Sequence, residues 1–243
     1  MKGILTATIL VVVFTTCSVN SFAQSESREN LLKQIETKRS ELSILEKKLL
    51  APSDEDLVAF SDFLKQDNTG LVRLLPREKY DSTPDKETLT IRGGGAYYSF
   101  ARLTHAYGYG SDIELAQGYL SVGFAGADYG VIAKVSNADI NEISIEHPSA
   151  FFLANYKAAT EEPAARLEWK RFGSGVTIDG VAYQHRVKAE PGMTYVLRSI
   201  DYGNSDLLVA VKVVRQDTDG SLIIAWKLLK KFPKPELARN DQP

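Results

Sequence analysis

Hydrophobic residues are spaced differently in the N-terminal part of the chain and in the remainder. From Ser25 to Leu50 they follow a 4-3 spacing, which predicts one helix on the order of 35–40 Å long at about 1.5 Å per residue. About three heptads are the lower limit for a coiled coil, so this helix is predicted to mediate oligomerisation or to form a stalk. The alternative is a helix packed against its own domain, or a lone amphipathic helix. The seam consists of Leu31, Ile35, Leu42, Leu45 and Leu49, with Lys38 as its polar member.

A shorter helix is predicted after Ala51–Pro52, because proline ends the first helix. Ser53–Asp56 has the form of a capping box with acidic residues in the first turn. Asn68–Gly70 provides a C-terminal stop signal. The apolar stretch Leu71–Leu75 then predicts a short turn of helix, and the polar residues 77–86 predict a linker.

From Glu87 onward, alternating apolar and polar positions with many aromatic and β-branched residues predict strands. Asp179–Gly180 is the signature of a two-residue type I′ hairpin. A second, longer hairpin is predicted around Asp217–Gly220, and both faces of its arms are apolar, which places them centrally in a sheet or between layers. The predicted strands cover residues 88–92, 96–107, 119–125, 131–135, 142–146, 176–178, 181–183, 194–199, 206–215 and 221–229.

Helices that precede the strands, rather than alternate with them, argue against a doubly wound parallel sheet. The predicted fold is mainly β (α+β overall): an antiparallel β-sandwich or partly open barrel preceded by one long and one short N-terminal helix. The predicted divisions are a signal peptide (1–23), the amphipathic or coiled-coil helix (24–50), a short helix and linker (51–86), the mainly-β domain (87–232) and a flexible tail (233–243).

The first 23 residues have the organisation of a secretory signal peptide. Lys2 is followed by the apolar stretch Ile4–Phe14, and a small-residue cleavage site ends at Ala23. We therefore predict an exported protein, periplasmic or extracellular. Lipidation at Cys17 is disfavoured because the residues before it are not small. Cys17 is the only cysteine in the chain, so the processed protein has no disulfide or thiolate. No later apolar run is long enough to span a bilayer.

Composition excludes several classes of function. The formal net charge is −2 over 243 residues, which argues against a nucleic-acid binder. The three glycines Gly93–Gly95 are followed by a predicted strand, not a helix, so they do not form a phosphate loop. The histidines His105, His147 and His185 have no metal-binding spacing. No cofactor and no metal are predicted.

The most unusual composition lies between residues 90 and 112, which combine glycines, four tyrosines, two arginines and a histidine. If residues 96–107 form one extended strand, Tyr97 and His105 share one face, and Tyr98 and Arg102 share the other. Tyrosine has an apolar ring and a polar rim, which suits a binding surface. A structural sheet with buried tyrosines is the alternative. The candidate binding residues are Arg92, Tyr97, Tyr98, His105, Tyr107, Tyr109 and Asp112.

These observations predict a non-enzymatic binding or scaffold module of the bacterial cell envelope. Its expected partners are an envelope protein or carbohydrate, and a second copy of the chain through residues 25–50. The alternative is an extracytoplasmic hydrolase with a tyrosine-lined pocket that uses His105 and Asp112. In that case both residues and a serine or second carboxylate must line one cavity.

Overall fold

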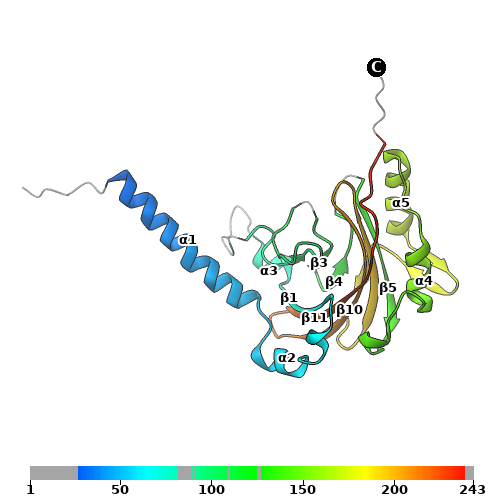
Figure 1. Ribbon diagram of the computed structural model, residues 1–243, viewed down its shortest axis with the longest axis horizontal. Helices are drawn as coiled ribbons and strands as arrows, with labels where there is room; N and C mark the ends of the chain where they lie inside the picture. The colour runs from blue at the N-terminus through cyan, green and yellow to red at the C-terminus, as the bar shows by residue number, and fades with distance from the viewer. Residues whose placement is uncertain (1–26, 82–88, 90, 109, 125–126, 239–243) are drawn as a thin grey trace, which may run out of the picture. The chain divides into compact units, whose positions relative to one another are not determined.

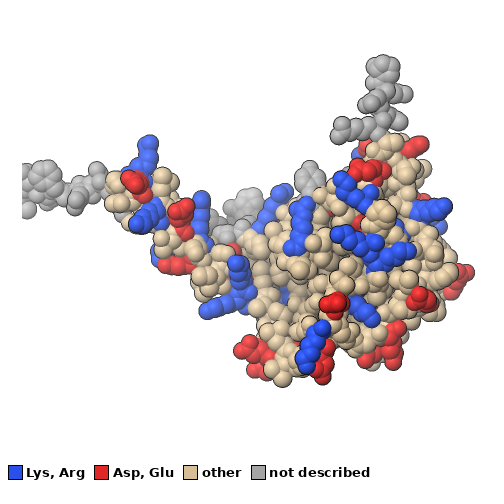
Figure 2. All heavy atoms as spheres, viewed as in Figure 1, with Lys and Arg blue, Asp and Glu red and all other residues tan. Residues whose placement is uncertain are grey.

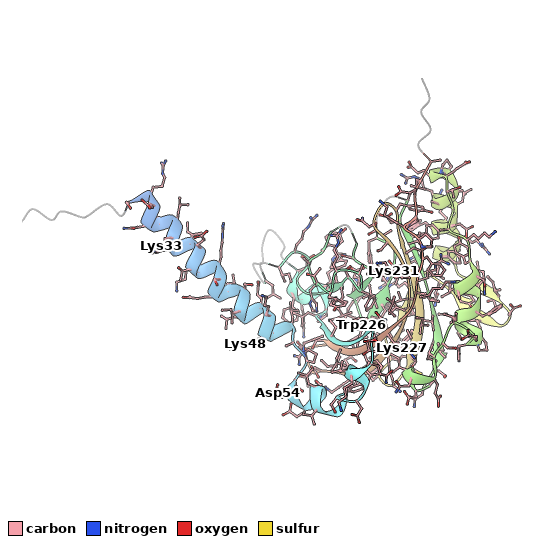
Figure 3. The ribbon with its side chains drawn as sticks, in the orientation of Figure 1. Lys33, Lys48, Asp54, Trp226, Lys227 and Lys231 are labelled. Atoms are coloured by element: carbon pink, nitrogen blue, oxygen red, sulfur yellow. The ribbon has the colours of Figure 1, made fainter. Side chains whose placement is uncertain are left out.

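The N-terminal helix α1 (Arg28–Leu50) begins and ends within three residues of its prediction. The computed structural model describes residues 27–81, 89, 91–108, 110–124 and 127–238; the predicted signal peptide and residues 239–243 lie outside them. The amide of Asn30 donates to Ser27 Oγ at 3.2 Å, which caps the helix. Basic and acidic side chains both occur along α1, where Lys33 and Lys48 are labelled (Figures 2 and 3).

The predicted seam of α1 is exposed to solvent. The exposed fractions of Leu31, Ile35 and Leu45 are 45%, 47% and 62%. Lys38, the polar seam residue, pairs with Glu41 at 2.8 Å on the same helix. The chain divides into two compact units after Leu42.

The second helix, α2 (Asp54–Ala59), has the predicted capping box. The Asp56 amide donates to Ser53 Oγ, and the Ser53 amide donates back to the Asp56 carboxylate. The same carboxylate also forms an ion pair with Arg215. Because Asp56 serves both the helix cap and this ion pair, α2 is fixed to the sheet that follows. A short 3-10 helix, η1 (Phe63–Lys65), completes this segment.

The larger antiparallel sheet has the strand order β1-β11-β10-β9-β5 in the described part of the chain (Figure 1). The long C-terminal hairpin is confirmed, and its arms lie centrally with both faces of β10 buried, as their apolar composition predicts. The strands are β1 (Thr69–Leu74), β5 (Tyr129–Ser136), β9 (Thr194–Asp201), β10 (Ser205–Gln216) and β11 (Leu222–Lys231).

The prediction of a helical turn at Leu71–Leu75 was wrong, because these residues belong largely to β1. Val72 and Leu74 are buried while Leu71 and Arg73 are only partly covered, which is the period of two expected for a strand. Pairing of β1 with β11, at the edge of the larger sheet, outweighs local helix preference. The segment 51–86 therefore contributes a strand to the larger sheet.

The smaller antiparallel sheet lies across one face of the larger one and has the order β2-β3-β4-β8 among the described residues. A separate hairpin, β6–β7, turns at Asp179 and Gly180, whose φ values of 50° and 80° confirm the predicted type I′ turn. These strands are β2 (Tyr97–Tyr98), β3 (Ile113–Ala116), β4 (Tyr119–Ser121), β6 (Val176–Ile178), β7 (Val181–Tyr183) and β8 (Arg186–Lys188).

Helices α4 (Pro148–Asn155) and α5 (Glu162–Ser174) pack on the opposite face of the larger sheet, against β5 and β9 (Figure 1). One apolar cluster fills the space between the two sheets, and a second lies between the larger sheet and these helices. The Trp226 side chain, labelled in Figure 3, belongs to the first cluster. The short helices α3 (Arg77–Tyr80) and η2 (Ile140–Glu142) lie in connections.

The fold class is confirmed: the protein is mainly β, with antiparallel, sandwich-like sheets preceded by a long and a short helix. The described strands do not close into a barrel. No described helix is both long enough and apolar enough to cross a membrane.

The predicted strand at 96–107 was wrong. The strand ends at Tyr98, and the chain then turns at Leu103, whose φ is 53°. The Asp112 carboxylate accepts a hydrogen bond from the Phe100 amide at 2.7 Å. That bond uses the donor that a continuing strand would offer to a neighbour, so the turn replaces the strand. The predicted division of residues 96–107 into two alternating faces is wrong for the same reason.

Two other strand predictions also need correction, and a third, at 119–125, holds only as far as Ser121, where β4 ends. Residues 142–146 form no strand, because Asp139 caps η2 through the Asn141 amide at 2.9 Å and Ser144 bonds locally with Glu146. Of the predicted strand 88–92, Ile91 and Arg92 form a turn, and residues 88 and 90 lie outside the described residues.

Candidate functional site

The interior between the two sheets changes from apolar to polar along a single strand. Tyr195, Leu197, Ser199 and Asp201 lie on the face of β9 that points toward the smaller sheet, because alternate residues share a face. All four are at most 5% exposed. Buried serine and aspartate require polar partners, so this end of the sandwich differs chemically from its apolar centre.

A cavity of about 200 Å³ lies at this polar end. Residues from four segments of the chain line it: the turn before β2, the loop between β2 and β3, the connection between β4 and β5, and the end of β9. Both charge signs and two aromatic rings face the same space. The side chains used in the following argument are Arg92, Tyr107, Phe124, Asp128, Ser199 and Asp201.

Strand register brings the two cavity carboxyls together. Tyr129 pairs with Ile200 across β5 and β9, so Asp128 lies opposite Asp201 where the strands end. Asp128 accepts a hydrogen bond from the Tyr202 amide at 2.9 Å. Asp201 accepts one from the Asn204 side chain at 3.1 Å. Like charges directly opposite each other across a sheet are destabilising, so this pair is an electrostatic cost to the fold.

Burial shifts both carboxyls toward their neutral forms. It raises the pKa of Asp128 to about 6, with a further contribution from the charge of Asp201 and an opposing one from the Tyr202 amide. Burial also raises the pKa of Asp201, although Asn204, Arg102 and a backbone amide partly offset this effect. Asp128 therefore exchanges a proton closer to neutral pH than an ordinary aspartate does, and the pKa of Asp201 is shifted in the same direction.

Arg92 and the aromatic rings form the opposite wall. A backbone bond of 2.9 Å from the Tyr107 amide to the Arg92 carbonyl aligns the two residues. The Arg92 guanidinium lies over the Tyr107 ring, 5.2 Å from its centroid. Tyr97 supports this wall from behind, with its ring 4.4 Å from Tyr107 and 5.5 Å from Phe124. Among the described residues, Arg92 has no carboxylate partner, which leaves its donors available.

Glycines allow the loops of the cavity to approach their supports closely. Gly94 has a φ of 60°, and a Cβ there would overlap the backbone of Tyr80, so only glycine fits between the loop and α3. Gly123, with a φ of 79°, lies against the backbone of Tyr129 and Gly130 in the same way. The glycine cluster thus provides close backbone approach and tight turns.

Tyr97 and Tyr98 are buried, at 4% and 8% exposed. Tyr97 donates a hydrogen bond to Glu114 at 2.8 Å, and burial, assisted by Glu114, raises its pKa. Tyr98 belongs to the apolar cluster between the sheets, and burial raises its pKa to about 12. Both tyrosines therefore act first as structural residues: Tyr97 supports the cavity wall and Tyr98 fills the core.

Asp112 is fully buried. Its Oδ2 accepts from the Phe100 amide and from Ser99 Oγ at 3.3 Å, which holds the turn after β2. Burial raises its pKa to about 6, opposed by the nearby Ser199 hydroxyl and backbone amides. Its Oδ1 makes no hydrogen bond with any described residue. Asp112 thus lies behind the cavity wall, adjacent to Ser199.

His105 lies in different surroundings. Its Nε2 is 2.8 Å from the Arg73 carbonyl oxygen, an acceptor, so Nε2 carries the proton. Its ring contacts Tyr98, with centroids 5.1 Å apart. Burial lowers its pKa and favours the neutral imidazole. It lines a separate groove of about 570 Å³ together with Tyr98, Leu71 and Leu103.

The structure therefore brings Arg92 and Tyr107 to the cavity, places Tyr97 and Asp112 directly behind it, and puts Tyr98 and His105 at the other groove. Tyr109 lies outside the described residues. Sequence reasoning missed Phe124, Asp128, Ser199 and Asp201. A usable signal was present in β9, where the face that carries Tyr195 and Leu197 continues as Ser199 and Asp201.

No cluster of three or more potential metal ligands occurs among the described residues. The cavity instead combines two carboxyls of raised pKa with a guanidinium and aromatic faces. Such an arrangement has the chemistry needed to bind groups of either charge or to exchange protons with a bound molecule. No protein-family model, curated protein or solved structure matches this chain.

Proposed function

We propose that the protein is an exported, non-enzymatic binding module of the bacterial cell envelope, and that its ligand site is the Asp128–Asp201 cavity. The observation that carries this proposal is the convergence of four chain segments on one cavity with opposed charges. Asp128 and Asp201 repel each other within the fold, and Arg92 has no acidic partner among the described residues. Groups that weaken the free protein in this way are typical of binding sites.

The cavity is small. Its volume of about 200 Å³ holds roughly six water molecules at about 30 Å³ each, below the range of pockets for drug-sized ligands. The ligand is therefore a single small solute or the end of a larger chain. A large protein partner would contact the cavity only through such an end.

A thermal-shift panel of sugars, organic acids, amines and amino acids tests the binding proposal. We expect at least one class to raise the melting temperature of the wild type and to lose this effect in Asp128→Asn. The exposed Asp67→Asn is the matched control for loss of one negative charge. Absence of stabilisation by every class, or equal stabilisation of Asp128→Asn, contradicts the proposal.

The exposed seam of α1 supports a second element of the proposal, self-association through residues 25–50. Leucines at heptad spacing that are 37–62% exposed in one chain gain burial when a second copy supplies a matching seam. Replacing Leu42 and Leu45 with serine is expected to convert an oligomer into a monomer in sedimentation equilibrium. A wild-type protein that is already monomeric at high concentration overturns this element.

Export rests on the predicted signal peptide, which lies outside the described residues. Cell fractionation and mass spectrometry of the full-length protein are expected to yield an envelope protein that begins at Gln24. Cys17→Ala separates this route from lipidation, because only a lipoprotein would lose its processing. A cytoplasmic, unprocessed protein contradicts export.

A hydrolase is the second candidate, and the cavity favours Asp128 and Asp201 over His105 and Asp112 as its reacting groups. Two carboxyls of raised pKa in one cavity are suited to general acid and general base roles in glycoside hydrolysis. Turnover of 4-nitrophenyl glycosides that disappears in both Asp128→Asn and Asp201→Asn would support it. Turnover that depends instead on His105 would restore the original assignment.

A further inference from the structure

The two walls of the cavity carry opposite charges, and this arrangement narrows the class of ligand. Asp128 and Asp201 lie on the side formed by β5 and β9, and Arg92 lies on the side formed by the turn before β2. Tyr107 and Phe124 provide apolar surface next to them. A neutral ligand leaves the repulsion between the two carboxylates in place, whereas a cation between them removes it.

We propose that the cavity binds a zwitterion of the size of a free α-amino acid, with its ammonium group between Asp128 and Asp201 and its carboxylate on Arg92. This inference rests on the proposed binding function and identifies the class of its ligand. Each cavity carboxylate has about four acceptor positions, and the backbone and side-chain bonds use only some of them. The fork of donors on an arginine matches a carboxylate in bidentate geometry.

Arg92 is already positioned for this role. The guanidinium lies over the Tyr107 ring, 5.2 Å from its centroid, and a side chain restrained by such a contact loses less entropy on binding. The aliphatic part of the ligand would contact Tyr107 and Phe124. The volume of about 200 Å³ limits that part to a small or medium side chain.

Other charged groups surround the pair and affect its charge. Arg102 lies near Asp201 and lowers its pKa, although its guanidinium also bonds to Asn204 at 3.2 Å. Asp112 lies behind Ser199 and adds a buried carboxyl to the same region. Because Asp128 titrates near pH 6 in the free protein, an ammonium ligand binds more weakly at pH 5. We expect a loss of roughly tenfold between pH 7.5 and pH 5, since about a tenth of Asp128 stays ionised.

Isothermal titration calorimetry with a matched ligand set tests the proposal. Glycine, L-alanine and L-leucine are the zwitterions; 3-methylbutylamine is leucine without its carboxylate, and 4-methylpentanoate is leucine without its ammonium. Glucose is the neutral control. We expect at least one amino acid to bind, and leucine to bind at least tenfold more tightly than either of its half-molecules.

Variants separate the two charged walls. Arg92→Gln is expected to reduce leucine affinity to that of 3-methylbutylamine and to leave the amine unaffected, and Arg92→Lys to restore part of the loss. Asp128→Asn is expected to weaken the binding of leucine and of 3-methylbutylamine equally, and to remove the pH dependence of ligand affinity. Arg92 is exposed, so its variants keep the fold, and circular dichroism verifies this for every protein used.

Three results overturn the inference. The first is that none of the three amino acids binds; the second is that 3-methylbutylamine binds as tightly as leucine; the third is that glucose or 4-methylpentanoate binds and leucine does not. In the third case the cavity still binds a solute and the proposed binding function stands. Failure of the whole thermal-shift panel, by contrast, removes both.

Discussion

Two buried carboxylates near the β9–β10 hairpin differ in what they contact. Asp206 of β10 forms a bidentate pair with Arg198, with both distances at 2.7 Å and each side chain 3% exposed. Asp201, at the end of β9 on the opposite face, is also buried but lies opposite another carboxyl, Asp128. The paired carboxylate belongs to the scaffold, and the repelling pair borders a cavity.

The partners of Arg198 explain why its pair is structural. Its Nη1 donates to the carbonyls of Leu153 and Tyr156 at 2.7 and 2.6 Å, at the C-terminal end of α4. Those carbonyls have no partner within the helix, so Arg198 satisfies them and fixes α4 to the sheet. A buried charge is tolerated where every group around it is satisfied. The cavity carboxyls instead lie opposite each other, and neither forms an ion pair with a described residue.

Removing Arg198 is expected to have the largest effect on stability. Arg198→Met leaves Asp206 buried without its cation and should lower the free energy of unfolding by roughly 3–5 kcal/mol. Urea denaturation monitored by circular dichroism measures this. Arg198→Met combined with Asp206→Leu should recover part of the loss, because no buried charge remains. If the free energy of unfolding of Arg198→Met alone lies within 1 kcal/mol of the wild-type value at the same pH, the distinction between the two carboxylates is contradicted.

The next effect contrasts two residues on the same face of β9. Leu197→Ala leaves a void in the apolar part of the sandwich and should cost roughly 2–5 kcal/mol. Ser199→Ala, two residues further along, borders the existing cavity and should cost less, about 1–2 kcal/mol, because it removes only a hydroxyl that bonds the buried Asp112 carboxyl. Denaturant midpoints of both variants measure the difference. Equal losses would mean that the polar end is packed as tightly as the centre.

Asp128→Asn is expected to change stability in a pH-dependent way. The folded pKa of about 6 is above the ordinary 3.8, so ionisation is costlier in the folded protein. The penalty is absent below pH 4, develops between pH 4 and 6, and persists above pH 6. The variant should therefore gain about 1–2 kcal/mol at pH 7.5 and nothing at pH 4, since one pKa unit is worth about 1.4 kcal/mol and solvent reduces the effect. A gain that is the same at both pH values contradicts this account.

The smallest expected effect is that of Arg92→Ala. The Arg92 side chain is exposed, and its contact with Tyr107 is the cation–π contact between the guanidinium and the tyrosine ring. The free energy of unfolding should therefore change by no more than about 0.5 kcal/mol. Comparing its free energy of unfolding with that of Arg198→Met, by the same urea denaturation, distinguishes an arginine that stabilises the fold from one available to bind a ligand. A loss above 2 kcal/mol would assign Arg92 to the scaffold.

Local signals in the sequence predicted much of the fold. The capping box at Ser53, the Asp179–Gly180 turn and the β10–β11 hairpin each depend on residues close together in the chain, and each is confirmed. The strand predicted at 96–107 failed because Asp112, which lies beyond that segment, binds the Phe100 amide. Likewise β1 was mistaken for a helical turn because its pairing partner, β11, lies about 150 residues away.

The sequence by itself determined the mainly-β antiparallel architecture and the long helix with its heptad seam, and it identified the unusual segment that contains Arg92 and the neighbouring tyrosines. Hydrophobic periodicity, turn residues and helix caps depend on residues a few positions apart, so they can be recognised in the sequence. Only the tertiary structure decided that Tyr97 and Tyr98 are buried and that Asp128 lies opposite Asp201. Those facts depend on the register of β5 against β9 and on which segments cover the ends of these strands. Because 57 residues separate Ser136 from Thr194, no local sequence signal specifies that register. The cavity arises from this long-range pairing, because it places groups together that have no local relation.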